Sequence, residues 1–484
     1  MIKSPIDTSQ LTIDELAEAL AQVYSADPRL KPNSAMHDYQ LTYPPAIQLE
    51  KPEFIHNPSH DEYVEQAIGN YKNVAFYFHF GFCQYHCRYC HHYEIRTARN
   101  EELMEWYLDS MIKEMRLFKT KAPHLKKLIY LPGGGTPTAI PTRLLKRFLE
   151  ELTNTFGASS SALSTVEVKP ITASTEKLEM LVKAGFSRIN LGVQTLDPEL
   201  YAFHHHNEKL SVALDAIDRA KACGFELINI DILTGLERQT PQSWQLTLDT
   251  INQLVADKKI DSVFIYPYHD DPRSKTFNQP EKLPTVLETA HSEVLARKLF
   301  EQLGWKELGT RFFRSPRHVR REIFEVVKIR ANPSYGELLY HGFGNSSFSV
   351  GDRATYLNHR KIEDYCAQIN QGKMGISHWT TLDDAQRATR DLSFDILYSP
   401  IVRVRAITKK YGEENMQSHL QNMQKWADMG LGKWNRFLGF FRLTKLGKLV
   451  HQQMLVALYL QPDQILFKEV MDERLKSGRA YRGY

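Results

Sequence analysis

The sequence has few cysteines, no long apolar run and no excess of charge of one sign. Only five of its 484 residues are cysteines. Three of the five lie within eight positions, which excludes a disulfide framework and favours a metal site in a reducing compartment. No stretch approaches the roughly 18 consecutive apolar residues that cross a bilayer. The first twenty residues lack an apolar core flanked by basic residues. These absences predict a soluble cytoplasmic protein without a membrane span.

The charges are balanced, with 61 basic and 57 acidic side chains and a formal net charge of +4. Because the two signs are mixed along the chain, no electrostatic footprint for nucleic acid stands out. A small or anionic substrate is compatible with this composition. Apolar residues make up 42% of the chain, enough to fill a core. The chain is too long for one ordinary domain, and we expect one large domain with attachments.

Short apolar runs alternate with amphipathic helical segments through the middle of the chain. The six runs are residues 75–80, 127–132, 166–168, 188–193, 226–233 and 262–268. Strands separated by helices of roughly 10 to 15 residues are typical of βα units and a parallel sheet. Six units fall short of the eight of a closed barrel. The pattern therefore predicts an α/β fold, an incomplete and laterally open (β/α)6 barrel that binds ligands at the carboxyl ends of its strands.

The rest of the chain divides around this barrel. Residues 1–70 form an N-terminal extension, residues 71–310 the barrel, and residues 311–387 a barrel-associated segment with a glycine-rich turn region. Residues 388–484 are predicted to form a helical or winged-helix-like cap, with a β-hairpin followed by a helix at 437–454. We expect the cap to cover a substrate cavity, and a nucleic-acid role is the less favoured alternative.

A C-x3-C-x2-C loop, Cys83, Cys87 and Cys90, follows the first predicted strand. Three thiolates on one loop can ligate three irons of a [4Fe–4S] cube and leave the fourth iron without a protein ligand. That open iron can bind the amino and carboxylate groups of S-adenosylmethionine. An electron from the cluster then breaks the S–C bond and releases a 5′-deoxyadenosyl radical.

The alternative for this loop is a structural zinc site. Cys3His is a common zinc ligand set, and His86, His91 or His92 could complete it. Zinc sites normally come as two separated ligand pairs, whereas all three thiols here occupy one loop. The spacing therefore favours iron–sulfur over zinc.

Polar or glycine-rich positions stand at the ends of the next predicted strands. The run Gly133–Pro137 can bring backbone groups close to a ligand. Glu167, Gln194 and Asp231 each interrupt or end an apolar run. A buried carboxylate such as Asp231 is costly unless a partner or ligand compensates it, whereas Glu167 could also be an exposed strand-end residue. Because the ends of parallel strands share one rim, we expect these positions to converge beside the cysteine loop.

The ordered motifs FYFHFGFCQYHCRYC, LPGGGTPT, VEVKPITAS, RINLGVQTLD and INIDILTGLERQT resemble the radical S-adenosylmethionine family of oxygen-independent coproporphyrinogen III oxidases and their relatives. The resemblance extends over roughly residues 71–480. It implies an incomplete barrel, one [4Fe–4S] cluster and often two molecules of S-adenosylmethionine. Positions that match the family's cofactor contacts are Tyr77, Tyr89, Gly134, Gly135, Thr136, Glu167, Gln194, His206, Asp231, Pro267 and Phe348. Tyr89 matches a contact to the second cofactor, and His206 stands where the family has an arginine.

Three departures bear on the subfamily. His92 replaces the fourth cysteine of the anaerobic decarboxylase, Gly81 replaces its usual proline, and His206 replaces its arginine. The resemblance then implies a specialised relative that transfers a methyl or methylene group or acts on a tetrapyrrole or a natural-product intermediate. Decarboxylation of coproporphyrinogen III is one alternative. A non-catalytic haem chaperone is another, with axial ligands from the histidines of the cysteine loop, His79 or the trio 204–206. A flavodoxin- or ferredoxin-type protein is the expected electron donor.

Overall fold

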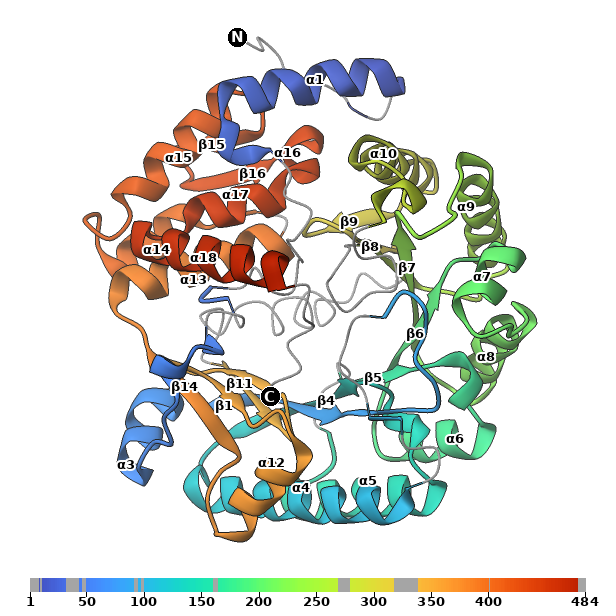
Figure 1. Cartoon of the computed structure of the whole chain (residues 1–484), viewed down its shortest axis with the longest axis vertical. Helices are drawn as coiled ribbons and strands as arrows, with labels where there is room; N and C mark the ends of the chain where they lie inside the picture. The colour runs from blue at the N-terminus through green and yellow to red at the C-terminus, as the bar shows by residue number, and fades with distance from the viewer. Residues whose placement is uncertain are drawn as a thin grey trace.

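A computed structural model describes residues 8, 11–31, 43–45, 49–90, 95–96, 100–159, 164–268, 279–316, 338–399 and 401–477. Within these ranges the chain forms an open arc of strands with helices around its outside (Figure 1). A second group of helices near the C-terminus stands beside the arc (Figure 1).

The six predicted strands are confirmed, each within a few residues of its expected bounds. They are β1 (Asn73–Phe80), β4 (Lys126–Gly134), β5 (Thr165–Val168), β6 (Arg188–Gln194), β7 (Leu227–Thr234) and β8 (Ser262–Pro267). β1 pairs with β4 in parallel, and β5, β6, β7 and β8 form a second parallel series. The backbone N–H of Tyr130 in β4 donates to the Ser164 hydroxyl beside β5 at 3.0 Å, which joins the two series. The incomplete barrel expected from the sequence is therefore present.

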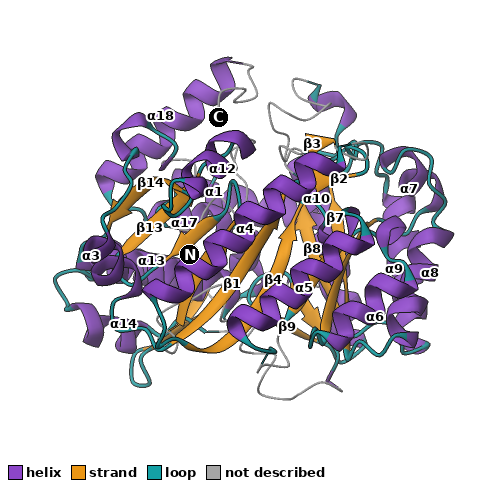
Figure 2. Ribbon diagram, turned by 90° about the horizontal axis from the view of Figure 1, so that it is seen from below, coloured by secondary structure: helices purple, strands orange, loops and turns teal. Residues whose placement is uncertain are grey.

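Helices follow the strands and cover the outer face of the arc (Figure 2). They are α4 (Glu101–Lys121), α5 (Thr142–Phe156), α6 (Thr175–Lys183), α7 (Pro198–His204), α8 (Ser211–Ala222), α9 (Pro241–Ala256) and α10 (Val286–Gln302). Alternate residues of β1, among them Phe76, Phe78 and Phe80, are buried in the core beneath α4 and α5. Because strand side chains alternate between faces, Tyr77 and His79 point into the arc instead.

Further strands extend both edges of the barrel. β11 (Leu338–Phe343) pairs in parallel with β1, and β12 (Phe348–Val350), β13 (Ala354–Asn358) and β14 (Ile376–Thr381) continue antiparallel, with α12 (Ile362–Asn370) between the last two. At the other edge, β10 (Phe312–Arg314) and β9 (Lys306–Leu308) follow β8. The glycine-rich turn region, predicted at residues 341–353, is therefore only partly a turn, since residues 341–343 belong to β11 and residues 348–350 to β12. In β11, Leu339 and Phe343 bury their side chains in the barrel core, a pattern that Gly342 obscures.

The N-terminal extension packs in two places. α1 (Ile13–Ala26) buries Leu16, Leu20 and Val23 in a core shared with the C-terminal helices. A π-helical segment, η5 (Tyr63–Ile68), instead packs into the barrel core. Short turns lie between them: η2 (Pro28–Leu30), η4 (Pro52–Phe54) and α3 (His60–Glu62).

The C-terminal region is helical with one hairpin, as expected. Its helices are α13 (Asp384–Tyr398), α14 (Val404–Tyr411), α15 (Gln417–Asp428), α16 (Lys445–Leu449), α17 (His451–Leu458) and α18 (Gln461–Ser477). β15 (Gly432–Asn435) and β16 (Phe440–Leu443) pair antiparallel between α15 and α16. The hairpin begins five residues before its predicted start, because the mixed sequence GKWN supplies its first strand.

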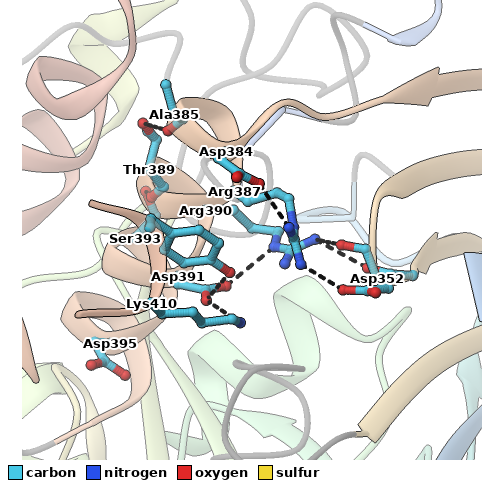
Figure 3. Close-up of polar contacts among 12 residues, drawn as sticks. Asp352, Asp384, Ala385, Arg387, Thr389, Arg390, Asp391, Ser393, Asp395 and Lys410 are labelled. Atoms are coloured by element: carbon cyan, nitrogen blue, oxygen red, sulfur yellow. Dashed lines mark hydrogen bonds and ion pairs between the residues drawn. The ribbon is translucent and has the colours of Figure 1, made fainter. Parts of the chain in front are cut away.

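Buried charges attach this cap to the sheet (Figure 3). The fully buried Arg390 of α13 donates to the backbone oxygens of Gly351 and Asp352 at 3.0 and 3.1 Å. Arg387 reaches the Asp352 carboxylate at 2.7 Å. Asp391 accepts from Arg390 at 3.3 Å and from the Tyr411 hydroxyl at 2.7 Å. Since each buried charge has a charged or hydrogen-bonded neighbour, this junction fixes the cap against the turn before β13.

In the described ranges no helix is long and apolar enough to cross a membrane.

Candidate functional site

The cysteine loop begins where β1 ends. A two-residue strand, β2 (Phe82–Cys83), pairs with β3 (Ile95–Arg96). Cys83 and Cys87 are buried, and Cys90 is half-buried. The Cys83 Sγ lies 3.2 Å from the Thr136 hydroxyl, and the Cys90 N–H donates to the Cys87 oxygen at 3.1 Å. The loop therefore sits directly against the end of β4.

Three glycines make this approach possible. The Gly135 N–H donates to the Phe80 oxygen at 2.7 Å, and a Cβ on Gly135 would lie 2.8 Å from the oxygens of both Phe80 and Phe82. A Cβ on Gly133 would lie 2.5 Å from a Glu167 carboxylate oxygen. The Gly134 N–H donates to the same carboxylate at 3.3 Å. The glycine run thus leaves room for the cysteine loop on one side and for Glu167 on the other.

Tyr77 and His79 line the inner face beside these glycines. The Tyr77 hydroxyl lies 3.2 Å from His79 Nδ1, and a Cβ on Gly134 would lie 2.7 Å from the His79 ring. We did not predict His79 as a cofactor contact. His79 stands two residues after Tyr77 in the same strand, and residues two apart in a strand share a face. This spacing is the sequence signal for placing His79 on the inner face.

Glu167 and Asp231 face the same side of the sheet. Glu167 is in register with Asn190, and Asn190 with Asn229. Asp231 is two residues beyond Asn229 and accepts a hydrogen bond from its side chain at 2.8 Å. A carboxylate in an apolar run requires a polar partner, and for Asp231 the Asn229 amide of the same strand is one such partner.

The remaining predicted contacts lie on separate elements. Gln194 ends β6 with a φ of +70°, a conformation uncommon for residues other than glycine. Pro267 ends β8, and Phe348 begins β12 and is half-buried. Tyr89 lies against the His205 ring, with 5.5 Å between the ring centroids.

His206 braces the cysteine loop. Its Nε2 contacts the His86 oxygen, and its ring lies 4.6 Å from that of Tyr85. The Lys169 ammonium lies 3.5 Å from the centroid of the same Tyr85 ring. His206 thus holds the backbone between Cys83 and Cys87.

The neighbouring histidines are neutral. Burial lowers the pKa of His204 to about 4 and that of His205 to about 3. His204 Nε2 lies 3.1 Å from the Glu237 oxygen, and the Glu237 carboxylate pairs with Arg88 at 2.5 and 3.0 Å. This second brace of the loop could not be predicted, because no local pattern in the sequence links Arg88 to a glutamate 149 positions away.

A buried carboxylate, that of Glu114, holds the loops next to the end of β1. Glu114 of α4 accepts hydrogen bonds from Gly344 N at 3.1 Å and Gly375 N at 2.9 Å, and from the side chains of Asn358 at 3.2 Å and Tyr365 at 2.6 Å. Burial raises its pKa to about 7. Earlier on α4, the Tyr107 hydroxyl donates to the His79 oxygen at 2.5 Å and accepts from Asn345 N at 3.1 Å.

Tyr107 and Gly135 therefore hold two successive carbonyl groups at the end of β1, those of His79 and Phe80. Gly344 has a φ of +91°, and a Cβ there would overlap the Tyr107 hydroxyl. Glu114 fixes this glycine turn, and the turn fixes the start of the cysteine loop. Glu114 could not be identified from the sequence, because nothing in its local sequence distinguishes it from an exposed helix glutamate.

The other two cysteines lie at helices α8 and α12. Cys223 caps α8 and Cys366 is buried in α12, and both are free thiols. His91 and His92 lie outside the described residues.

The residues present fit an iron–sulfur cluster. Three thiols lie on one braced loop, and the glycines bring the end of β4 against it. Tyr77 and Glu167 lie beside the glycines that the loop contacts, and Asp231 lies on the same face of the sheet as Glu167. These groups suit the hydroxyls and the ammonium group of a polar cofactor.

Comparisons with known proteins agree with this arrangement. Residues 77–251 match the family model described as the radical SAM superfamily. Oxygen-independent coproporphyrinogen III oxidase of Salmonella typhimurium is 25% identical over 387 residues, 76% of this chain and 82% of the relative. The haem chaperone HemW of Bacillus subtilis is 30% identical over 211 residues, 43% of this chain and 53% of the relative.

The same fold occurs in a solved structure. That of coproporphyrinogen III oxidase from Escherichia coli aligns with a TM-score of 0.71 at 20% identity, covering 87% of this chain and 96% of the other. The radical SAM match over residues 77–251 implies a [4Fe–4S] cluster and S-adenosylmethionine as cofactors. Residues 77–251 therefore form a radical SAM domain, which makes the chain an enzyme, and over most of its length the chain is similar to the oxygen-independent coproporphyrinogen III oxidases.

Proposed function

We propose that Cys83, Cys87 and Cys90 hold the [4Fe–4S] cluster and that S-adenosylmethionine binds across the ends of β1, β4 and β5. The observation that carries this proposal is the contact of the cysteine loop with Thr136, next to glycines that Glu167 and His79 touch. A cluster held there supplies the electron that cleaves S-adenosylmethionine to a 5′-deoxyadenosyl radical. This chain's own residues position the cofactor and exclude water.

Individual residues take separate tasks in this proposal. The backbone of Gly134 and Gly135 and the hydroxyls of Tyr77 and Thr136 contact the bound cofactor. The carboxylates of Glu167 and Asp231 accept hydrogen bonds from its ammonium and ribose groups. Gln194, His206 and Pro267 complete the rim. His206 acts by holding the backbone of the cysteine loop, since its ring contacts the His86 oxygen.

A second molecule of S-adenosylmethionine binds beside the first in this proposal. Tyr89 of the cysteine loop is its contact, and Phe348 at the start of the edge strand β12 is a further cofactor contact. The cap covers the substrate cavity, and the N-terminal extension holds the cap through α1.

The substrate proposed is a tetrapyrrole, supported by the names of the oxidase relatives. A hydrogen atom is transferred to the adenosyl radical, either from the substrate or from the methyl group of the second cofactor. In the second case the methyl group of the second cofactor becomes a methylene radical, whose carbon adds to an sp² carbon of the substrate. We favour methyl or methylene transfer because His92, Gly81 and His206 replace residues of the decarboxylase pattern. The enzyme works in the cytoplasm with a flavodoxin- or ferredoxin-type donor, because cleavage requires a low-potential electron.

Two other functions have support. The oxidase relatives favour oxidative decarboxylation, in which the adenosyl radical takes a hydrogen atom from a propionate side chain, carbon dioxide leaves, and the remaining electron passes to an external electron acceptor. The likeness to a haem chaperone favours haem binding without turnover. The neutral state of His204 and His205 leaves their ring nitrogens able to act as ligands, although both side chains are buried.

One experiment separates the three functions. Anaerobically reconstituted protein is incubated with S-adenosylmethionine, reductant and candidate tetrapyrroles, and the products are analysed by mass. Gain of one carbon supports transfer, whereas loss of carboxyl groups supports decarboxylation. Stoichiometric haem binding with no deoxyadenosine above the level of a cluster-free variant would support the chaperone and contradict the proposed reaction.

A further inference from the structure

We propose that the hairpin β15–β16 and helix α14 form a surface that binds anionic phospholipid bilayers peripherally. We call it the basic hairpin face and define it by its exposed members, Arg405, Lys409, Lys433, Arg436, Phe437, Leu438 and Arg442. This proposal goes beyond the radical chemistry and does not depend on it.

The face is made from two stretches of sequence that contain no acidic residue. Residues 399–412 and 429–462 include no aspartate or glutamate. The structure joins them through paired backbone hydrogen bonds between Val402 and Phe441, at 2.7 and 3.0 Å. The Arg405 N–H also donates to the Gly439 oxygen at 2.9 Å. Cations from α14 and from both hairpin strands therefore share one part of the surface.

The turn of the hairpin presents large apolar side chains to solvent. Phe437 is 84% exposed and Leu438 is 51% exposed. The turn is well ordered by hydrogen bonds, since Leu438 N donates to the Asn435 side chain and Gly439 N to the Asn435 backbone oxygen, both at 2.8 Å. The Arg405 guanidinium also reaches the Phe437 oxygen. These hydrogen bonds fix the turn so that Phe437 and Leu438 point into solvent. A turn exposed only to water would normally carry polar side chains at these positions.

The cations of the face are not neutralised by neighbours. Arg405, Lys409, Lys433, Arg436 and Arg442 form no ion pair with any residue that the structure describes. Arg436 instead lies over the Trp434 ring, 4.8 Å from its centroid.

The acidic residues next in sequence lie at helix ends. Glu413 and Glu414 follow α14, and Asp428 ends α15. The positive charge of the hairpin and of the exposed side of α14 therefore remains available to an anionic partner.

Cations around a protruding apolar tip match the interface of an anionic bilayer. Phenylalanine and leucine enter the boundary between headgroups and acyl chains, while lysine and arginine remain at the headgroups. A nucleic acid would offer phosphates to the cations but no apolar surface to Leu438. An anionic bilayer serves both halves of the face at once, and each cation near its surface strengthens binding by roughly fivefold.

Vesicle sedimentation tests the proposal with the full-length holoprotein. Vesicles of phosphatidylcholine alone are compared with vesicles of about three parts phosphatidylcholine to one part phosphatidylglycerol. We expect binding to the anionic vesicles only, and we expect it to weaken as sodium chloride rises, because salt screens exposed charges. Equal binding to both vesicle types, or none to either, would overturn the proposal.

Variants locate the surface. The double variant Phe437→Ser with Leu438→Ser removes the apolar tip, and Lys433→Glu with Arg436→Glu reverses two charges. Each should weaken binding to anionic vesicles by on the order of tenfold or more. Ile55→Ser is the matched control, since Ile55 is 63% exposed near the N-terminus and belongs to no part of the face.

Iron content and deoxyadenosine formation separate a loss of membrane binding from a loss of the cluster. Iron content and deoxyadenosine formation in solution should equal those of the parent in all three variants, so failure of this proposal is distinct from failure of the radical chemistry. If the hairpin variants bind anionic vesicles like the parent but lose binding to a DNA duplex, the face is a nucleic-acid surface and the membrane proposal is wrong.

Discussion

The two sides of the strand arc hold their polar residues differently. At the ends of β1, β4 and β5, contacts cross from one element to the next: Cys83 meets Thr136, Glu167 meets Gly134, and His79 meets Tyr77 and the glycine run. Within β7, Asp231 accepts a hydrogen bond from its own strand, from Asn229. Just after β7, Glu237 crosses to Arg88 of the cysteine loop. The ends of β1, β4 and β5 are thus built as a close-packed support, whereas Asp231 is held by a neighbour in its own strand.

This difference suggests a division of labour. A support that excludes even a Cβ suits a group that must be held in one position, such as a cluster. Side chains at the ends of β6, β7 and β8 suit a ligand that binds and leaves. Each prediction below either breaks the support or sharpens the distinction between the two sides.

The largest effect is expected from the cysteine loop. Anaerobically reconstituted protein should hold about four irons per chain, the stoichiometry of a cube. Cys83→Ala, Cys87→Ala and Cys90→Ala should each abolish iron binding and deoxyadenosine formation. Iron analysis and the visible absorbance of the cluster measure the first effect. Cys223→Ala is the control and should change neither, because that thiol lies at the end of α8. A colourless protein with one zinc per chain would contradict the cluster.

The next largest effect is expected at Gly135. A methyl group there would meet two backbone oxygens at 2.8 Å, those of Phe80 and Phe82, so the cysteine loop must shift. We expect Gly135→Ala to lose most of the reconstituted iron and to bind S-adenosylmethionine weakly. Gly81→Ala is the matched control in the same loop, since the nearest atom to its Cβ would be 3.5 Å away. Equal iron content in the two variants would show that the close approach is not required.

The sequence predicted the residues at the ends of β1, β4 and β5 better than the buried side chains that hold them in place. Periodicity predicted the strands, and the spacing of cysteines and glycines placed them at one rim, because these signals are local. Glu114 and Tyr107 lie in α4, yet they hold Gly344 and Asn345 more than two hundred positions away. Arg88 and Glu237 meet in the same way. Such contacts depend on how β11 and α7 pack against the barrel, which no local pattern in one sequence reveals.

The edge strands were missed for a related reason. β11 contains Gly342, and the turn after it is rich in glycine and serine, a composition that favours turns. The structure uses Gly342 for close packing, since a Cβ there would lie 2.7 Å from the Ser347 side chain. The parallel pairing with β1 outweighs the local preference.

A smaller and pH-dependent effect is expected from Glu114→Gln. This variant tests the buried carboxylate that holds the glycine turn at Gly344. All four partners of this carboxylate donate hydrogen bonds, and each of its two oxygens accepts one from a backbone N–H. In the glutamine variant an NH2 group replaces one oxygen, so one backbone N–H faces a donor. We expect a less stable protein in chemical denaturation.

The penalty should depend on pH in a defined direction. The pKa of Glu114 is raised to about 7, so the stabilisation of the protonated folded state is complete below the ordinary pKa and is lost as pH rises through 7. The variant has no such loss. The difference in free energy of unfolding between parent and variant should therefore shrink by on the order of 2 kcal/mol between about pH 5 and pH 8. A constant difference would show that this carboxyl does not titrate there.

The smallest effects are expected from Glu167→Gln and Asp231→Asn, which compare the two sides directly. Both changes keep the size of the side chain and remove its charge. A charge-assisted hydrogen bond contributes about 1.5 to 3 kcal/mol, so each variant should bind S-adenosylmethionine on the order of tenfold more weakly. Both should retain the cluster and melt close to the parent, because a glutamine fits beside Gly133 as well as the native glutamate does, and an amide at position 231 can still accept from Asn229. Calorimetric titration of the cofactor into anaerobic protein measures the affinity. Unchanged affinity with a large loss of melting temperature would assign both carboxylates to the fold, and the support at β1, β4 and β5 would then extend across the whole rim.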